Sequence, residues 1–180
     1  ATEVEQSLMD SLAGAIGLDP RFTFAGGGGG VIQDSASSAA LVALLAALHR
    51  SNPGWRADGV DGLERVYVTA ETHSSLAKAV RVAGLGERAL HVVGPSPGSL
   101  AMSPRALAAA IGADVAAGQR PVLVCPTVGT TGTGAVDPVR EITAVAQPHG
   151  TWVHVDAAWA GVAALCPEHR HLLDGVEHAD

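Results

Sequence analysis

The chain has 180 residues, of which 47% are hydrophobic and 16% are charged, which is enough apolar material for one domain with its own core. The net charge of −7, without a clustered basic stripe, argues against nucleic acid and anionic membrane surfaces as partners. No uninterrupted apolar run in the sequence is long enough to cross a bilayer.

The two cysteines, Cys125 and Cys166, lie far apart in a sequence in which no signal peptide is recognisable. Reduced thiols in a cytoplasmic protein are therefore expected. The chain begins with Ala1 and ends at Asp180 without a helix-closing signal, which indicates a piece of a longer protein; a trimmed chain has the same appearance. No interdomain linker or internal repeat is visible, so we expect residues 1–180 to form a single domain.

The predicted elements alternate between helices and strands. Leucines at positions 41, 44, 45 and 48 follow helical spacing, and Ser103-Pro104 combines an N-cap with proline at the first helical position. Helices are expected at residues 4–18, 36–50, 73–83, 104–117 and 137–149. Strands are expected at 65–69, 89–93, 121–126 and 151–156, with a short extended piece at 31–33. This order predicts an α/β fold, with a mostly parallel sheet, helices on both faces and right-handed crossovers.

The stretch TWVHVDAAWAG, at residues 151–161, reads as a buried strand that ends in a carboxylate. Asp156 stands at the C-terminal end of this strand, where ligands bind in open α/β sheets. An unpaired buried carboxylate is costly, so Asp156 requires a cationic partner. The single lysine of the chain, Lys78, lies on a different element. The partner is therefore an arginine, a metal or a cationic ligand.

Three other segments carry polar groups at the same expected edge. Ser35-Ala36-Ser37 opens a helix, whose N–H groups suit an anion, although plain N-capping also explains serine there. Threonine hydroxyls in the loop at 127–134 could contact a ring substituent or phosphate, or only stabilise a turn. His73 starts the helix after the strand at 65–69, where histidine is usually a surface or capping residue. Three such loops at one edge favour a binding site.

Other common site patterns are missing. The glycine run at 26–30 does not complete a dinucleotide fingerprint, because Val31 stands at its last position, and no Walker-type Gly-Lys-Ser/Thr occurs. His154 and Asp156 share a strand face and could be two metal ligands, but no HExxH or clustered Cys/His set accompanies them. We therefore expect no metal site.

Taken together, four parts of the chain resemble the group II pyridoxal-phosphate-dependent decarboxylases, specifically the aromatic-L-amino-acid decarboxylase branch. These parts are GGGVIQDSASSAALVALLAALHR, the HSS that begins at His73, PTVGTTGTGAVDPV, and HVDAAWAG with CPEHRHLLDGVEHAD. They follow the family's order over nearly the whole chain. The resemblance implies a fold type I large domain, a homodimer with the active site at its interface, and conversion of an aromatic L-amino acid to its amine and CO2.

The resemblance also assigns residue roles, of which those of Asp156 and His73 are catalytic. Asp156 would pair with the pyridine nitrogen of pyridoxal 5′-phosphate and keep it protonated, so that the ring accepts electrons. His73 would stack on the ring and orient the substrate. Ala36 and Ser37 would bind the 5′-phosphate, Thr131 would contact the 3-oxygen side of the ring or the nearby carboxylate, and Ala158 would pack under the ring.

Some departures from the family pattern are expected to matter. The lysine that forms the family's resting Schiff base follows the segment that matches 175–180, and Lys78 matches no such motif. The family's N-terminal segment and small C-terminal domain also have no counterpart here, so the chain alone is expected to be inactive. Asp34, where the family often has glycine, would repel a phosphate unless it turns away.

Three alternatives remain open at this point. Related enzymes decarboxylate glutamate, diaminobutyrate or histidine. Others are aromatic aldehyde synthases, and in certain of these the position matching His73 is not histidine, which favours simple decarboxylation here. The third alternative is a truncated domain of the same fold that binds the cofactor without catalysis.

Overall fold

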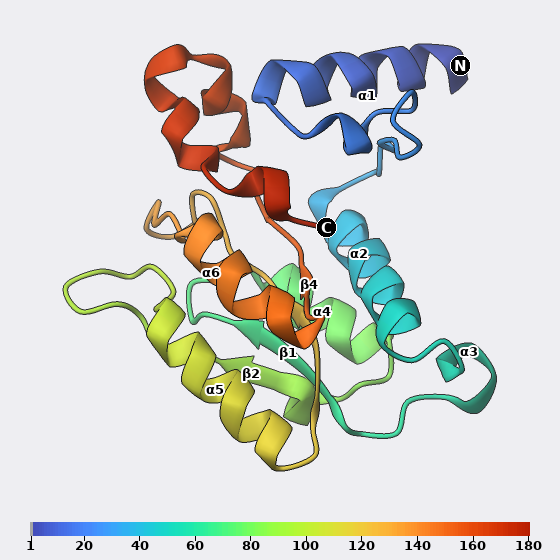
Figure 1. The fold of residues 1–180 in the computed structure, drawn as a ribbon, viewed down its shortest axis with the longest axis vertical. Helices are drawn as coiled ribbons and strands as arrows, with labels where there is room; N and C mark the ends of the chain where they lie inside the picture. Colours follow the sequence, from blue (N-terminus) through green and yellow to red (C-terminus); the bar gives the residue numbers. More distant parts are fainter. Residues whose placement is uncertain (1) are drawn as a thin grey trace.

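The computed structural model describes residues 2–180, which form an α/β fold around a four-stranded parallel sheet (Figure 1). The strands are β1 (Glu64–Val68), β2 (Leu90–Val92), β3 (Arg120–Val124) and β4 (Trp152–Val153). The helices are α1 (Thr2–Ile16), α2 (Ala36–Ser51), α3 (Trp55–Asp58), α4 (Ser74–Val82), α5 (Pro104–Ala116) and α6 (Val139–Ala146). Short 3-10 turns are η1 (Pro20–Phe22), η2 (Glu87–Ala89), η3 (Gln147–His149), η4 (Gly161–Leu165), η5 (Pro167–Leu173) and η6 (Val176–His178).

The helices begin where the sequence supplies capping groups. The Ser35 hydroxyl accepts the backbone N–H of Ser38, and the Ser38 hydroxyl accepts the backbone N–H of Ser35, so α2 starts with a capping box. Ser103 caps α5 in front of Pro104, as expected. These caps satisfy N–H groups that a helix start would otherwise leave without partners.

The sheet has the strand order β2-β1-β3-β4, with helices on both faces. On one face, α2 and α4 pack against β1 and β3 through a core that includes Leu44, Leu48 and Val66. On the other face, α5 and α6 pack against the sheet through Ile111, Ile142 and their neighbours. The predicted fold class is therefore confirmed.

The direction of the connections explains this layering and locates a crevice. The chain passes from β1 to β2 through α4 on one face, then returns past β1 to β3 and on to β4 through α5 and α6 on the other face. Crossovers of one hand require this change of face when the direction of travel reverses. The reversal lies between β1 and β3, and ligands in open α/β sheets bind outside the carboxyl ends of strands at such a point.

Some elements differ from their sequence-based prediction. Residues 31–33 form no strand, and α6 ends at Ala146 because Pro148 allows only a 3-10 turn after it. The segment that begins at Gly161 folds into three successive 3-10 turns, η4 to η6, which periodicity did not indicate. These turns (red) lie beside α1 (blue) in Figure 1, and α1 contacts η4.

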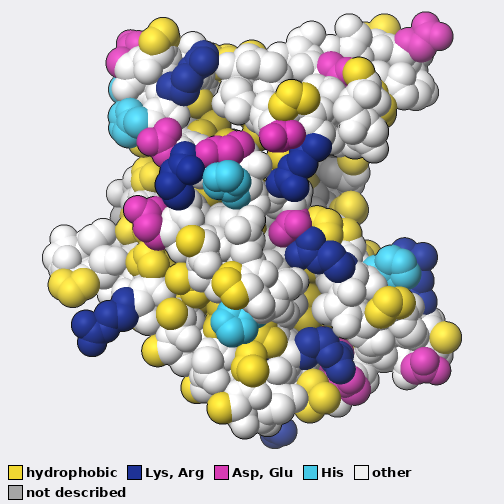
Figure 2. All heavy atoms as spheres, viewed as in Figure 1, with side chains coloured by type: hydrophobic (Ala, Val, Ile, Leu, Met, Phe, Trp, Pro, Cys, Tyr) yellow, Lys and Arg dark blue, Asp and Glu magenta, His cyan; other side chains and the backbone are white. Residues whose placement is uncertain are grey.

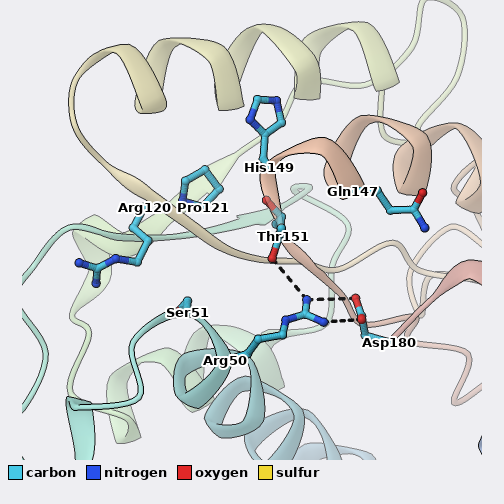
Figure 3. Close-up of a pocket in the computed structure, with 9 residues that line it drawn as sticks. Arg50, Ser51, Arg120, Pro121, Gln147, His149, Thr151 and Asp180 are labelled. Atoms are coloured by element: carbon cyan, nitrogen blue, oxygen red, sulfur yellow. Dashed lines mark hydrogen bonds and ion pairs between the residues drawn. The ribbon is translucent and has the colours of Figure 1, made fainter.

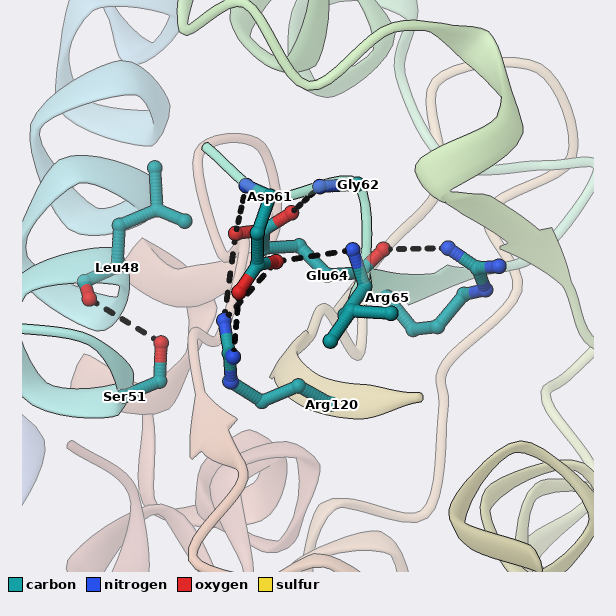
Figure 4. Close-up of polar contacts among 8 residues, drawn as sticks. Leu48, Ser51, Asp61, Gly62, Glu64, Arg65 and Arg120 are labelled. Atoms are coloured by element: carbon teal, nitrogen blue, oxygen red, sulfur yellow. Dashed lines mark hydrogen bonds and ion pairs between the residues drawn. The ribbon is translucent and has the colours of Figure 1, made fainter. Parts of the chain in front are cut away.

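Ion pairs join the segments at which β1 and β3 begin (Figure 4). Arg120 reaches Asp61 at 2.7 Å and Glu64 at 3.4 Å, and the Arg120 hydrogen bond lowers the pKa of Asp61. Glu64 is only 1% exposed, and it also accepts the backbone N–H of Gly62 at 3.0 Å. This arrangement pairs a deeply buried carboxylate, which would otherwise destabilise the fold.

A large cavity of about 490 Å³ opens at the edge of the sheet where these strands begin (Figure 3). Arg50, one of the two arginines that line this cavity, forms an ion pair with Asp180, with 2.5 Å between nitrogen and oxygen. Its guanidinium carbon lies 4.4 Å from the centre of the Trp152 ring. The Asp180 carboxylate also accepts the backbone N–H of Val153 at 3.0 Å. Arg50 and Asp180 thus hold α2 against β4. The cavity lies where the strands begin, at the opposite edge of the sheet from the one where a ligand is expected.

Figure 2 shows acidic and basic side chains interspersed over the visible face of the molecule, with apolar side chains between them. No helix within residues 2–180 combines the length and apolar character needed to cross a membrane.

Candidate active site

A cavity of about 180 Å³ lies at the carboxyl ends of the strands, at the point where the strand order reverses. Three of the four strands contribute through the segments that follow them: β1 through His73, β3 through its threonine-rich loop, and β4 through Asp156. The first residue of α2 completes the wall. The lining residues are Ala36, His73, Thr127, Gly129, Thr131, Asp156, Ala158 and Trp159.

The structure thus brings five of the six residues singled out from the sequence around one cavity. They come from segments up to 122 positions apart, between Ala36 and Ala158. Ser37 follows Ala36 in the first turn of α2 but does not line the cavity. The roles assigned to these residues stay predictions, whereas their common location is observed.

Asp156 extends the pairing of β4 with β3 beyond the strand itself. It forms a parallel bridge with Thr127, in which Val128 donates to the Asp156 carbonyl at 2.8 Å and Asp156 donates to Pro126 at 2.9 Å. One carboxylate oxygen accepts the backbone N–H of Ala158 at 3.1 Å. The backbone is therefore fixed on both sides, and the carboxylate is held at the cavity wall.

No lysine, arginine or histidine within residues 2–180 forms an ion pair with Asp156. The described residues also contain no group of three or more His, Cys, Asp or Glu placed to hold a metal ion. Of the partners expected for this carboxylate, a cationic ligand is the one that the geometry leaves room for.

His73 caps α4 with its own side chain. Its Nδ1 accepts the backbone N–H of Ser75 at 3.2 Å and lies 2.9 Å from the Ser75 hydroxyl. Because Nδ1 accepts a backbone hydrogen bond, the proton of the neutral ring sits on Nε2. The capping role considered from the sequence is thus observed, and it also fixes the orientation of the imidazole at the cavity.

The loop between β3 and α6 is held in shape by Asp137. This carboxylate is 2% exposed and accepts the backbone N–H groups of Thr127 at 2.8 Å and Met102 at 2.6 Å. Burial raises the pKa of Asp137, and the two N–H bonds act against that rise. The Asp137 N–H in turn donates to the Thr127 carbonyl at 2.9 Å, so Thr127 is clamped by the same residue twice.

The side chain of Asp34 is hydrogen-bonded at the start of α2. Its carboxylate accepts a hydrogen bond from the Ser38 hydroxyl, one turn into α2. The Ser38 hydroxyl also lies near Ser35, so the acidic group is tied into the capping network at the helix start. Asp34 is thus held at the start of α2, and its repulsion of a phosphate stays a prediction.

Thr127, Gly129 and Trp159 line the cavity although the sequence did not single them out individually. Gly129 adopts φ +83°, and a Cβ there would lie 2.6 Å from both the Ala160 Cβ and the Trp159 ring. The signal for Gly129 was only its place in a threonine-rich loop. The signal for Thr127 appears once β3 and β4 are known to be neighbours, because Thr127 then stands directly beside Asp156.

His154 and Lys78 are not part of the cavity lining. Lys78 is exposed on α4. Burial lowers the pKa of His154 below its usual range, and the Asp156 carboxylate opposes this shift more weakly. The half-buried position of His154 therefore favours the neutral form of its imidazole.

The lowered pKa of His154 predicts a dependence of stability on pH. As the pH falls from about 7.5 to about 5.5, the unfolded chain takes up a proton that the native His154 resists, so the free energy of unfolding decreases. In His154→Gln this contribution disappears, and we expect the decrease to be smaller by up to about 1 kcal/mol. Urea denaturation at both pH values measures it, and an equal or larger decrease in the variant would contradict the assignment.

Comparison with known proteins agrees with the observed fold. The model of the pyridoxal-dependent decarboxylase conserved domain matches residues 1–180. An L-tyrosine/L-DOPA decarboxylase of Lophophora williamsii is 44% identical over the whole chain, which covers 34% of that relative. A phenylacetaldehyde synthase of Petunia hybrida is 39% identical, again over the whole chain and 36% of the relative. The chain thus spans about a third of the length of these relatives.

A solved structure supports the same assignment. The Oryza sativa TDC structure with PLP and tryptamine superposes with a TM-score of 0.91 and 43% identity, covering 99% of this chain and 37% of the other. The fold is therefore that of the fold type I PLP-dependent decarboxylases. The chain belongs to the pyridoxal-dependent decarboxylase family.

Proposed function

We propose that the protein carrying this chain is a pyridoxal-phosphate-dependent decarboxylase that converts an aromatic L-amino acid to its amine and CO2. The main supporting observation is the cavity at the point where the strand order reverses. It brings His73, Thr131 and Ala158 around the carboxylate of Asp156, which has no ion-pair partner among residues 2–180. The aromatic preference is supported by the likeness to the tyrosine/DOPA decarboxylase and to the rice enzyme bound to tryptamine.

The residues of the cavity fit a flat, cationic and anion-bearing ligand. Asp156 supplies a negative charge for a protonated ring nitrogen, and His73 supplies an imidazole for one ring face. Ala158 is a small residue beside Asp156, so a ring has space to lie there. Ala36 and Ser37 occupy the first turn of α2, where free backbone N–H groups favour a phosphate.

In this proposal the residues of the chain hold the reaction centre in place. Bound in the cavity, pyridoxal phosphate supplies an electron-accepting ring that stabilises the charge left at the α-carbon when CO2 departs. Asp156 retains the proton at the ring nitrogen, which makes the ring a better acceptor. His73 limits the position of the substrate, while the Thr131 hydroxyl would contact the 3-oxygen side of the ring or the nearby carboxylate. Lys78, which does not line the cavity, is not the residue that anchors the cofactor.

The direct test is to incubate the protein with pyridoxal phosphate and, separately, with tyrosine, tryptophan, phenylalanine and dihydroxyphenylalanine. We expect the matching amine and CO2 in equal amounts from at least one of them. Failure to form amine from any of the four would refute the aromatic substrate class. Glutamate, diaminobutyrate and histidine in the same assay test the other decarboxylase reactions.

A second candidate function, an aromatic aldehyde synthase, is favoured by the 39% identity to the petunia phenylacetaldehyde synthase. Such an enzyme would consume oxygen and water and would yield aldehyde, CO2, ammonia and hydrogen peroxide. Measuring hydrogen peroxide and aldehyde beside the amine separates the two reactions. Aldehyde and peroxide in stoichiometric yield would replace the decarboxylase proposal.

We further propose a homodimer in the cytoplasm. Apolar side chains stay exposed along α1 and around the start of η4, which suits a surface covered by a partner subunit. They are Val4, Leu8, Leu12, Trp159, Val162 and Leu165. Both cysteines are free thiols, as a reducing compartment would maintain them. Light scattering coupled to size exclusion tests the dimer, and a monomer at micromolar concentration would count against it.

A further inference from the structure

One polar atom of the cavity has no hydrogen-bond partner in the structure. Thr127 is 4% exposed, and its hydroxyl oxygen is buried without a donor or acceptor nearby, although the residue lines the cavity beside Asp156. In the described part of the chain, three other buried side-chain atoms share this state, on Trp55, Gln119 and Thr151. None of these three residues lines the cavity, so within residues 2–180 Thr127 is the one cavity-lining residue that carries such an atom.

The position of this hydroxyl is imposed by the surrounding backbone. Asp137 clamps both the N–H and the carbonyl of Thr127, and the bridge to Asp156 fixes the residue on its other side. A β-branched side chain on a fixed backbone has few rotamers, so the hydroxyl has little freedom to seek a partner elsewhere. A buried hydroxyl without a hydrogen bond destabilises the fold, and such atoms are uncommon in native proteins.

We propose that the Thr127 hydroxyl is a further cofactor-binding group, which makes a polar contact to bound pyridoxal phosphate on the wall that it shares with Asp156. This inference rests on the proposed function, because it takes the cofactor to be the occupant of the cavity. A hydroxyl both donates and accepts, so it can serve a ring substituent next to the carboxylate that serves the ring nitrogen. Binding of the cofactor would then satisfy the hydrogen bond that the protein itself leaves unmet.

This role has an unusual signature, because one substitution should raise the stability of the cofactor-free protein and lower its affinity for the cofactor. Thr127→Val keeps the shape of the side chain and removes the hydroxyl. Without cofactor, the variant loses an unsatisfied buried group, so its melting temperature should rise by about 2–4 °C. With cofactor, it loses a contact, so its Kd for pyridoxal phosphate should increase about five- to tenfold.

Thr151→Val is the matched control. Its hydroxyl is also buried without a partner, at 2% exposure, but it lies at the opposite edge of the sheet. We expect a similar gain in melting temperature and an unchanged Kd for pyridoxal phosphate. Thr127→Ser, which retains the hydroxyl, should keep the Kd within about twofold of the wild type.

The experiment uses the protein that carries this chain, stripped of cofactor and then titrated with pyridoxal phosphate by absorbance, with melting followed in parallel. A Kd within about twofold of the wild type in Thr127→Val, or a lower melting temperature of its cofactor-free form, would overturn the assignment of Thr127 alone. If the wild type binds no pyridoxal phosphate, both this inference and the proposed function fail. If it binds the cofactor but decarboxylates nothing, only the proposed reaction fails, and the Thr127 result still stands.

Discussion

Replacing Asp156 with Asn should leave the fold intact and remove most of the decarboxylase activity. Asn has nearly the same shape, and the backbone bonds that hold residue 156 to Pro126 and Val128 do not involve the side chain. The substitution removes the one negative charge that would keep the ring nitrogen protonated, because the cavity lining contains no second carboxylate. We expect kcat to fall on the order of 10²-fold or more, as for the loss of one preorganised electrostatic contact.

The measurement is single-substrate kinetics at saturating pyridoxal phosphate, with circular dichroism to verify the fold. Asp174→Asn is the control, since Asp174 is an exposed carboxylate on the same C-terminal part of the chain and does not line the cavity. It should keep near-normal kcat. Near-normal activity in Asp156→Asn would show that Asp156 is misassigned.

The sequence was sufficient to predict the class of fold, because its alternation of strand and helix patterns reflects forces that act locally. Capping residues and periodic leucines placed α2 and α5 within one or two residues of their observed bounds. The 3-10 turns η4 to η6 escaped prediction, since they follow no regular apolar period. They are held by packing, with Ala164 and Leu173 buried against α1 and the loop before α6.

The residues of the candidate site also fall into those that the sequence identified and those that it did not. Asp156 and His73 could be selected because each stands at the end of a predicted strand with a chemically suggestive side chain. Thr127 and Trp159 could not, since their importance depends on which strands are neighbours and on the path of the chain after Asp156. The pairing of Thr127 with Asp156 joins residues far apart in sequence, and a single sequence contains no direct signal of it.

Gly129 provides a second test of the site, in which packing rather than charge is changed. Gly129→Ala places a Cβ 2.6 Å from the Ala160 Cβ and 2.6 Å from the Trp159 ring, and it does so at φ +83°. The left-handed backbone costs an L-residue about 1–2 kcal/mol, and overpacking adds about 1–3 kcal/mol. We therefore expect the free energy of unfolding to fall by about 2–5 kcal/mol, measured by urea denaturation of the cofactor-free protein.

Gly134→Ala separates these two contributions. Gly134 lies in the same loop at φ +68°, and a Cβ there meets nothing within 4 Å. This variant should lose only the backbone part, about 1–2 kcal/mol, and should keep its affinity for pyridoxal phosphate. Gly129→Ala should also bind the cofactor more weakly, because Trp159 lines the cavity and must move to make room. Equal losses of stability in the two variants would mean that the Trp159 wall yields freely, and that the cavity is not held rigid by the loop after β3.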